Sequence, residues 1–405
     1  MGMHAASAPL PRHPTGALAD HFRPEAPPGV RGGRFARHAR AHFASLLRRA
    51  DVELDGAAPW DPRVHDDRLF ARVLVDGTLG LGEAYVDGWW DCPRLDELVA
   101  RVARAGVAAA RWSWRDVLAV AEARIWNAGR RSRAFDIATH HYDLGNDLFE
   151  AMLDRRLTYS CAYWKDARDL DEAQEAKLDL ICRKIGLRPG MRVLDIGSGW
   201  GSFAIFAAER YGARVVGLTV SQAQQRLATE RGRHLPVEFR VQDYRDVDEP
   251  FDAVVSIGMF EHVGPKNYGT YFDVVRRCLR PDGLSLLHTI GSRAPSAAGD
   301  GWIMRYIFPG AHLPSAHELT RALGRTFVIE DWHNFGADYD RTLLAWDTNF
   351  RAGWDRLRVR YDQRFYRLWR YYLLTCAGKF RARQNQLWQI VLAKNGVTGG
   401  YASLR

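Results

Sequence analysis

A glycine-rich stretch in the middle of the chain has the residue types and spacing of a ligand-binding turn. Asp195 lies within a short apolar run, and Gly197, Gly199 and Gly201 follow it at alternate positions. Glycine lets the backbone turn tightly and approach a ligand, and the helix expected after Gly201 would point its free N–H groups at that ligand. The stretch therefore predicts a cofactor site at the end of a buried strand.

The same turn distinguishes two kinds of adenine-containing cofactor. A dinucleotide-binding turn would have a third glycine at the position of Ser202 and an acidic residue about 20 positions further on. The next strand ends instead in Leu218 and Thr219. Asp195 before a G-x-G turn is similar to the first motif of S-adenosylmethionine-dependent methyltransferases. At this point a glycine turn of some other α/β domain stays open as an alternative.

Polar side chains follow the other predicted strands as well. A cofactor with an adenine, a ribose and a cationic sulfur needs an acceptor for the adenine amine, for which Asp243 is a candidate. Thr219 and Gln224 are candidates for the ribose hydroxyls, and Glu261 and His288 follow two further strands. Each residue alone is equally consistent with an ordinary strand-end polar group. Because parallel strands end at one edge of a sheet, we expect the whole set to converge there.

Strands and helices alternate in the part of the chain that carries these residues. Five segments read as strands from their short apolar runs, at 193–196, 213–220, 237–244, 251–258 and 283–290. Helical periodicity precedes the first of them and separates most of the others. This alternation predicts an α/β fold with a doubly wound, mostly parallel sheet.

The composition limits the class of protein and its partners. The chain has 405 residues, 47% of them hydrophobic and 26% charged, which favours more than one globular unit. Its net charge of +9 indicates an anionic partner, either a membrane surface or a negatively charged substrate, and no nucleic-acid recognition signature accompanies it. Five scattered cysteines favour a reducing compartment, and no long apolar run or leader is present. We therefore predict a cytoplasmic protein.

The chain divides into four segments. Residues 1–33 are rich in Pro, Gly and Ala and predict a disordered tail. Residues 34–122 predict a small, mainly helical N-terminal domain, 123–140 a basic linker, and 141–405 the cofactor-binding domain. The helix that begins at Arg34 is basic and amphipathic. We favour packing of this helix on its own domain, and contact with a membrane stays open.

Eight motifs in order resemble the cyclopropane-fatty-acyl-phospholipid synthases. They are YSCAYWKDA, VLDIGSGWG, VQDYRD, GMFEHVGPKNY, LLHTIGS, YIFPG, EDWHNFGADYD and CAGKFRAR. The resemblance runs from about Arg34 to the end of the chain. It includes GLGEAYVDGWW of the N-terminal domain, which the related single-domain mycolic acid methyltransferases lack. It implies a seven-stranded methyltransferase sheet, an acyl-chain tunnel and a homodimer.

The resemblance also implies a reaction. A methyl group would pass from S-adenosylmethionine to the cis double bond of a phospholipid acyl chain, and ring closure would give a cyclopropane and S-adenosylhomocysteine at the inner face of the cell membrane. Ser198 stands where many relatives have Cys. The implied cofactor-binding residues are Tyr159, Ser160, Asp195, Gly197, Ser198, Gly199, Trp200, Gly201, Thr219, Ser221, Gln222, Gln224, Gln242, Asp243 and Tyr244.

The family is also described as holding a bicarbonate ion. The matching catalytic positions are Cys161, Glu261, His288, Tyr339 and the backbone of Ile290, with Glu330 nearby. An alkene is a weak nucleophile, so its methylation needs a strong donor and a dry, aligned site. Methylation leaves a carbocation, and a base must then remove a proton. Glu261 beside an anion is acceptable if it accepts the bicarbonate hydroxyl proton or is itself protonated.

Two further groups of residues are candidates for substrate contacts. Tyr306, Phe308 or Trp332 could stabilise the cation, although aromatic side chains more often pack against an acyl chain. The segment 351–383 holds ten Lys and Arg residues against two Asp, interleaved with aromatic residues. These arginines could meet lipid phosphates, or they could belong to a solvated helix that packs on the sheet.

Several alternatives remain at this stage. Cys161, Glu261 and His288 could bind zinc, but their spacing matches no short metal motif, so no metal is predicted. A related enzyme could leave a methyl branch or methylate an amine head group. A membrane-binding protein with a degenerate enzyme fold is disfavoured by the intact site residues. An NAD-dependent oxidoreductase is disfavoured by Ser202 and the missing acidic residue.

Overall fold

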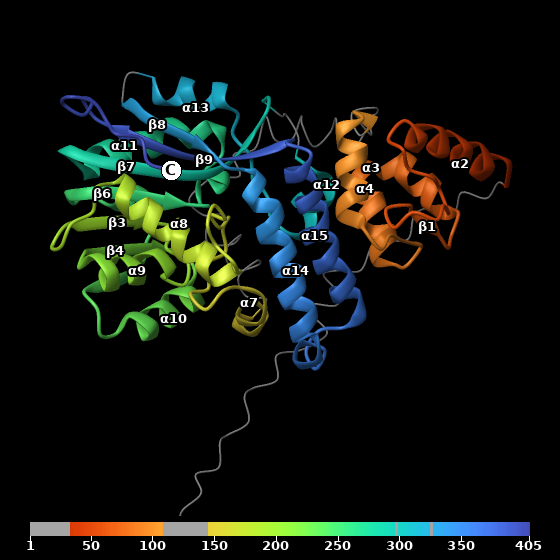
Figure 1. Cartoon of the computed structure of the whole chain (residues 1–405), viewed down its shortest axis with the longest axis horizontal. Coiled ribbons are helices and arrows are strands. Elements are labelled where there is room, and N and C mark those ends of the chain that lie inside the picture. Colours follow the sequence, from red (N-terminus) through yellow and green to blue (C-terminus); the bar gives the residue numbers. More distant parts are fainter. Residues whose placement is uncertain (1–32, 108–144, 296–298, 325–326) are drawn as a thin grey trace, which may run out of the picture.

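The computed structural model describes residues 33–107, 145–295, 299–324 and 327–405 (Figure 1). The predicted linker 123–140 lies outside the described residues, and so does the predicted tail apart from residue 33. The side chains of residues 33–37 are likewise outside the description. The three proposed domain boundaries, at 33/34, 122/123 and 140/141, therefore stay predictions.

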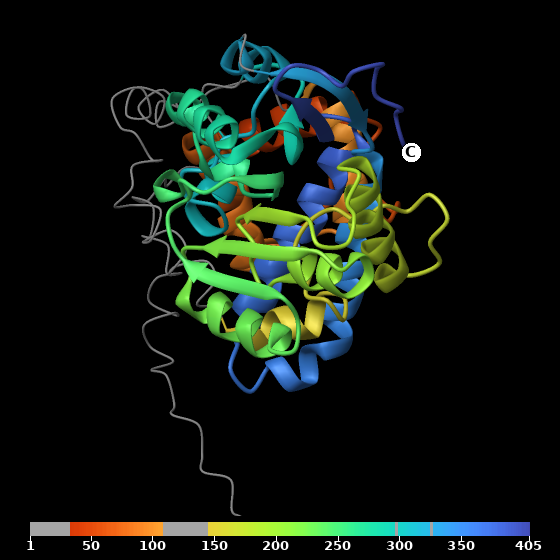
Figure 2. The same ribbon diagram turned by 90° about the vertical axis from the view of Figure 1, so that its left-hand side faces the viewer.

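A seven-stranded sheet lies at the end of the molecule opposite the N-terminal helices, and Figure 2 shows this end facing the viewer. The strand order is β5-β4-β3-β6-β7-β9-β8. The first five strands are parallel, and β9 runs antiparallel to both β7 and β8. The strands are β3 (Arg192–Ile196), β4 (Arg214–Thr219), β5 (Val237–Val241), β6 (Phe251–Ile257), β7 (Leu279–Ser292), β8 (Val328–Asn334) and β9 (Asn385–Ala393). The predicted doubly wound, mostly parallel sheet is confirmed.

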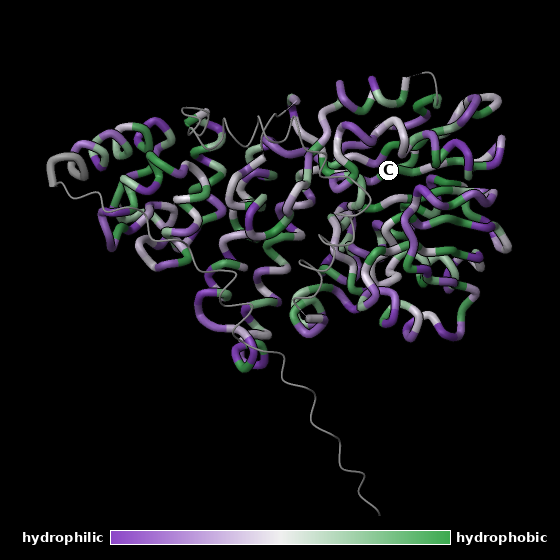
Figure 3. The backbone as a smooth tube through the Cα atoms, turned by 180° about the vertical axis from the view of Figure 1, so that it is seen from behind, coloured by the Kyte–Doolittle hydropathy of each residue, from purple (hydrophilic) through white to green (hydrophobic). Residues whose placement is uncertain are grey.

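Helices cover both faces of this sheet. On one face, α8 (Leu170–Lys184), α9 (Ser202–Tyr211) and α10 (Gln222–Gly232) enclose a core with β3 and β4. On the other face, α11 (Tyr268–Cys278) and α13 (Ala316–Leu323) pack on the opposite sides of the same strands. The strands are buried on both faces, so they read as continuous apolar runs, which Figure 3 shows as hydrophobic stretches inside the molecule.

Two long helices separate the sheet from the N-terminal part (Figure 1). They are α14 (Ala337–Leu357) and α15 (Gln363–Arg381), and the short helices α7 (Asn146–Met152) and α12 (Gly301–Tyr306) lie beside them. At Gly378 of α15 an added Cβ would lie 2.4 Å from the backbone oxygen of Asp96. Only glycine permits this close approach between α15 and the N-terminal helices.

The N-terminal part is mainly helical. Its elements are α2 (Gly33–Arg48), β1 (Arg63–Val64), α3 (Arg68–Val86), β2 (Trp90–Asp91) and α4 (Leu95–Arg104). Helix α3 is kinked at Gly77, whose φ of 59° is left-handed. Phe43 of α2 contacts Phe70 of α3 with ring centroids 5.7 Å apart. This apolar face of α2 thus packs on its own domain, as the favoured interpretation of the segment expects.

The arginines of α14 and α15 are largely engaged inside the protein. Arg364 pairs with Asp87 and Arg367 with Asp91, which ties α15 to the N-terminal part. Arg381 pairs with Asp96, Glu97 and Asp340, Arg370 with Asp347, and Arg360 with Asp147. Acidic groups of the same chain thus already pair with these five arginines, and contact of the segment 351–383 with lipid phosphates stays a prediction.

Candidate functional site

The glycine turn lies between β3 and α9, as predicted. Gly197 and Gly199 have φ angles of 85° and 54°, which side-chain-bearing residues rarely adopt. A Cβ on Gly197 would lie 2.6 Å from Cβ of Met259, so this position has no room for a side chain. Nothing lies within 4 Å of a Cβ built on Gly199. The backbone at Gly199 is therefore open to a ligand.

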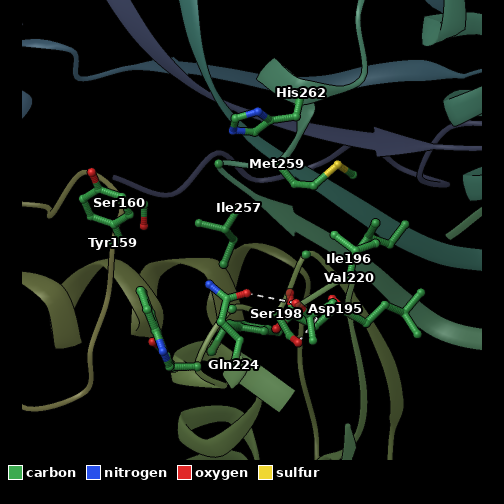
Figure 4. Close-up of a pocket in the computed structure, with 18 of the residues that line it drawn as sticks. Tyr159, Ser160, Asp195, Ile196, Ser198, Val220, Gln224, Ile257, Met259 and His262 are labelled. Atoms are coloured by element: carbon green, nitrogen blue, oxygen red, sulfur yellow. Dashed lines mark hydrogen bonds between the residues drawn. The ribbon is translucent and has the colours of Figure 1, made fainter. Parts of the chain in front are cut away.

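A cavity of about 200 Å³ lies at this turn and at the carboxyl ends of the neighbouring strands. Figure 4 shows Tyr159 and Ser160 on one side of the pocket and Met259 and His262 on another. Asp195 is drawn beside Ser198, away from Tyr159 and Ser160. Twelve of the fifteen predicted cofactor residues line this pocket: Tyr159, Ser160, Asp195, Gly197, Ser198, Gly199, Trp200, Thr219, Gln224, Gln242, Asp243 and Tyr244. The strand-end reasoning thus located one contiguous site.

Three predicted cofactor residues do not line the pocket. Gly201 and Ser221 are the N-cap residues of α9 and α10, and Gln222 is the first residue of α10. The hydroxyl of Ser221 accepts the N–H of Gln224 at 3.3 Å. Ser221 thus shapes the helix start that presents Gln224, since a capping oxygen satisfies one of the free N–H groups there.

The end of the pocket near β4 and β5 has two polar pairs. Thr219 donates its hydroxyl hydrogen to Oε1 of Gln224 at 2.9 Å. Both oxygens of Asp243 accept from Arg245, at 2.9 and 2.6 Å, and Asp243 is 4% exposed. Arg245 lines the pocket and is a residue that the sequence reasoning missed. Each carboxylate oxygen keeps further acceptor capacity, as contact with an adenine amine requires.

The pocket is also lined by two buried residues that can carry a charge, Asp195 and Lys177. Asp195 is 1% exposed, and its Oδ2 has no hydrogen-bond partner among the described residues. Burial raises the pKa of Asp195 to about 7, against the opposing effect of Lys177. Lys177 of α8 is completely buried, and its Nζ donates to Oγ of Ser160 at 2.9 Å.

Lys177 was not singled out from the sequence, although a signal was present. Ala173, Lys177, Ile181 and Lys184 follow one another at intervals of three or four residues on the face of α8 that points to the core. A buried lysine at a core-facing position destabilises the folded protein unless a partner or ligand interacts with its ammonium group. This spacing therefore indicates a functional lysine.

A second polar cluster begins with Glu261, in the turn that follows β6. Its Oε1 accepts the N–H of Ile290 at 2.7 Å, whereas its Oε2 is buried without a partner in the described part of the chain. Burial raises the pKa of Glu261 to about 7. The side chain is therefore a strong acceptor with one oxygen still available.

His288 of β7 is a neutral donor in this cluster. It is 1% exposed, and burial holds its pKa well below the usual range, so the imidazole carries no charge. Nε2 of Gln389 on β9 lies 3.3 Å from Nδ1 of His288. With the Gln389 amide in this orientation its nitrogen donates, so Nδ1 accepts and the ring proton is assigned to Nε2, which has no partner among the described groups.

Cys161 directly follows Ser160, which lines the pocket, and Tyr339 belongs to α14. Oγ1 of Thr342 accepts the N–H of Ala162 at 3.1 Å, which fixes the segment after Ser160 against α14. Cys161 is completely buried and Tyr339 is 8% exposed, and burial raises the pKa of both well above the usual range. Negative charge on Cys161 or Glu261 would raise the pKa of Tyr339 further.

Two predicted catalytic positions differ from expectation. The N–H of Ile290 already donates to Glu261, so it orients that carboxylate in this structure. Glu330 lies away from the cluster: it sits at a register irregularity of β8, and its Oε1 accepts the N–H of Val397 at 2.7 Å. His288 pairs with Gln389 of β9, which in turn pairs with His333 of β8. Glu330 therefore lies at a different level along β8 from His288.

The three candidate aromatic residues lie in different parts of the structure. Phe308 lines the pocket together with Ile307, Met259 and Val263. Tyr306 donates its hydroxyl to Glu83 at 2.6 Å, which joins α12 to α3. Trp332 packs on Trp388 with centroids 5.1 Å apart, in the core under α11 and α13. Of the three, Phe308 alone has a place in the pocket wall.

All five cysteines are free thiols. Within the described residues, Cys161, Glu261 and His288 do not form a group that could hold a metal ion.

Comparison with known proteins gives a consistent result. The family model described as Mycolic acid cyclopropane synthetase matches residues 129–390. The cyclopropane-fatty-acyl-phospholipid synthase of Escherichia coli K12 is 52% identical over 356 residues, which cover 88% of this chain and 93% of that protein. The tuberculostearic acid methyltransferase UfaA1 of Mycobacterium tuberculosis is 33% identical over 90% of this chain and 91% of its own.

Solved structures agree with the sequence relatives. The mycolic acid cyclopropane synthase CmaA1, solved as a complex with SAH and CTAB, is 34% identical with a TM-score of 0.59. The match covers 64% of this chain and 97% of that one. The match leaves out a part of this chain that is about as long as residues 1–140, the segments before the predicted cofactor-binding domain.

Proposed function

Because the chain belongs to the mycolic acid cyclopropane synthetase family, we propose that it converts a cis double bond in the acyl chain of a phospholipid into a cyclopropane. The chain is an S-adenosylmethionine-dependent methyltransferase of the cyclopropane-synthase type. The phospholipid substrate is the finer part of the proposal. Its support is the Escherichia coli synthase, whose match to this chain extends over the N-terminal segment as well.

The pocket fits S-adenosylmethionine. Asp195 Oδ2 is a buried acceptor without a partner among the described residues, Gly199 leaves the backbone accessible, and Asp243 and Gln224 offer further polar groups. When bound, S-adenosylmethionine supplies an electrophilic methyl group. The residues of the glycine turn and the strand ends would hold it, and they are those that the sequence predicted.

The surrounding side chains exclude water from the reacting groups. Cys161, Glu261, His288 and Tyr339 are each at most 8% exposed. Ile307, Phe308 and Met259 give the pocket an apolar wall, which suits a hydrocarbon better than a polar substrate. A carbocation formed here would meet few water molecules, so proton loss and ring closure would be favoured over hydration.

We propose that the cluster beside the pocket holds a bicarbonate ion. His288 Nε2–H would donate to its oxygens, and Glu261 Oε2 would accept its hydroxyl hydrogen, since both atoms are buried and lack partners in the described chain. When bound, bicarbonate would supply a small base. Ile290 N–H keeps Glu261 in place, and Tyr339 and Cys161 close the cluster.

The observation that carries this proposal is the pair of unpartnered buried atoms, Glu261 Oε2 and His288 Nε2, next to a methyltransferase pocket. The test incubates the purified protein with vesicles of unsaturated phospholipid and isotope-labelled S-adenosylmethionine. We expect a labelled lipid heavier by one methylene, with formation that depends on added bicarbonate. Formation that is unaffected by complete removal of bicarbonate would contradict its role.

A second candidate is methyl branching without ring formation. The observation that favours it is the likeness to the tuberculostearic acid methyltransferase over 90% of this chain. Nuclear magnetic resonance of the lipid product distinguishes the two, because cyclopropane ring protons resonate far from those of a branched methyl group.

We further propose that the protein works as a homodimer at the inner face of the cell membrane. No helix of the described segments is long and apolar enough to span a bilayer. An enzyme that acts on acyl chains of an intact bilayer must contact its surface. Cosedimentation with vesicles and light scattering test the two statements separately.

A further inference from the structure

Lys177 is a buried cation that the proposed reaction does not yet use. Its side chain is completely buried and lines the pocket. No carboxylate of the described residues lies within ion-pair distance of its Nζ, which donates to Oγ of Ser160. Burial lowers its pKa to about 8. An unpaired buried ammonium destabilises a fold, so a ligand that offsets its charge is expected.

The groups around Lys177 narrow the kind of ligand. Asp154 is engaged by the N–H groups of Arg156 and Thr158, at 2.9 and 2.7 Å, and by the Thr158 hydroxyl. Asp195 retains one buried oxygen without a partner. This end of the pocket therefore combines one cation and one anion that are both available. Such a pair is complementary to the α-carboxylate and α-ammonium of an amino acid.

Ser160 connects Lys177 to the cavity. Since Nζ of Lys177 donates to Oγ of Ser160, the hydroxyl hydrogen of Ser160 is free to point elsewhere, and Ser160 lines the pocket (Figure 4). The ammonium polarises this hydroxyl and makes it a stronger donor to an anion. A carboxylate that accepted from Ser160 would then be held by a charge-assisted chain.

We propose that Lys177 is a positioning residue that acts through Ser160 to fix the carboxylate of the methionine moiety of S-adenosylmethionine, while Asp195 receives the ammonium. This inference rests on the proposed function. It explains why the buried face of α8 carries a lysine. It also implies that the charge of Lys177 determines which adenosyl compounds bind in the pocket.

The test measures binding rather than turnover. Calorimetric titration of the full chain with S-adenosylhomocysteine, decarboxylated S-adenosylmethionine and 5′-methylthioadenosine compares ligands that have and lack the carboxylate. In Lys177→Met we expect the affinity for S-adenosylhomocysteine to fall about tenfold or more. The affinities for the two ligands without a carboxylate should change less than about twofold, because these ligands lack the group that Lys177 is proposed to hold.

Lys184→Met is a matched control. Lys184 lies two turns further along the same helix, is equally buried and also has its pKa lowered to about 8. It pairs with Asp331 at 3.2 Å and does not line the pocket. We expect lower stability in this variant and unchanged selectivity among the three ligands.

A second variant keeps the inference testable if Lys177→Met does not fold. Ser160→Ala removes the connecting hydroxyl, and we expect the same selective loss of S-adenosylhomocysteine. Equal losses for all three ligands, or unchanged affinity in both variants, would overturn the inference. If the wild-type chain failed to bind S-adenosylhomocysteine at all, the proposed function would fail instead, so the two failures are distinguishable.

Discussion

Replacing Glu261 with Gln should make the protein more stable and less active at the same time. The amide can still accept the N–H of Ile290 through its oxygen, so the local geometry is preserved. It cannot ionise, and its nitrogen replaces the acceptor Oε2 with a donor. Stability and activity therefore respond to different consequences of one isosteric change.

The magnitude follows from the pKa of Glu261. Burial raises it from 4.5 to about 7 in the folded protein. The folded state thus binds the proton more tightly than the unfolded state, and the free energy of unfolding falls as pH rises from 4.5 through 7. Above that pH the ionised carboxylate costs about 3 kcal/mol relative to its neutral form. Glu261→Gln avoids this cost, so its gain in stability should appear above pH 7 and vanish near pH 4.5.

Urea unfolding of both proteins across this pH range measures the difference. Activity, followed by labelled lipid product, should fall about 10²–10⁴-fold, the range for loss of a group that assists proton transfer. Glu83→Gln is a control of opposite sign, because Glu83 forms a buried ion pair with Arg72 and its loss should lower stability. A Glu261→Gln variant that is less stable above pH 7 yet fully active would refute the reasoning.

Three further outcomes are expected. Gly199→Ala should cost about 1 kcal/mol of stability, because its φ of 54° is left-handed, and should weaken S-adenosylhomocysteine binding measured by calorimetry. Gln389→Leu removes the donor that sets the tautomer of His288, so product formation should fall while S-adenosylhomocysteine affinity stays unchanged. Arg364→Ala should lower the melting temperature through loss of its ion pair with Asp87, and vesicle cosedimentation should not change; a reverse pattern would support arginines of α15 as lipid contacts.

The sequence by itself determined the sheet class, and it predicted most of the residues that line the pocket at the strand ends. Short runs such as 193–196, followed directly by glycines that favour a tight turn, are typical of strands buried on both faces of a parallel sheet. The family was confirmed as well, because its motifs are long and occur in order.

Tertiary structure alone decided which polar groups are engaged and which are free. Glu330 and the arginines of α15 have the same residue types as functional groups, but they are paired with Val397 N–H and with acidic side chains. The spacing on α8 indicates only that Lys177 faces the core, whereas its contact with Ser160 comes from the packing of the folded chain. A one-dimensional pattern records charge and periodicity, whereas the partners that neutralise a charge come from distant segments that only the folded chain brings together.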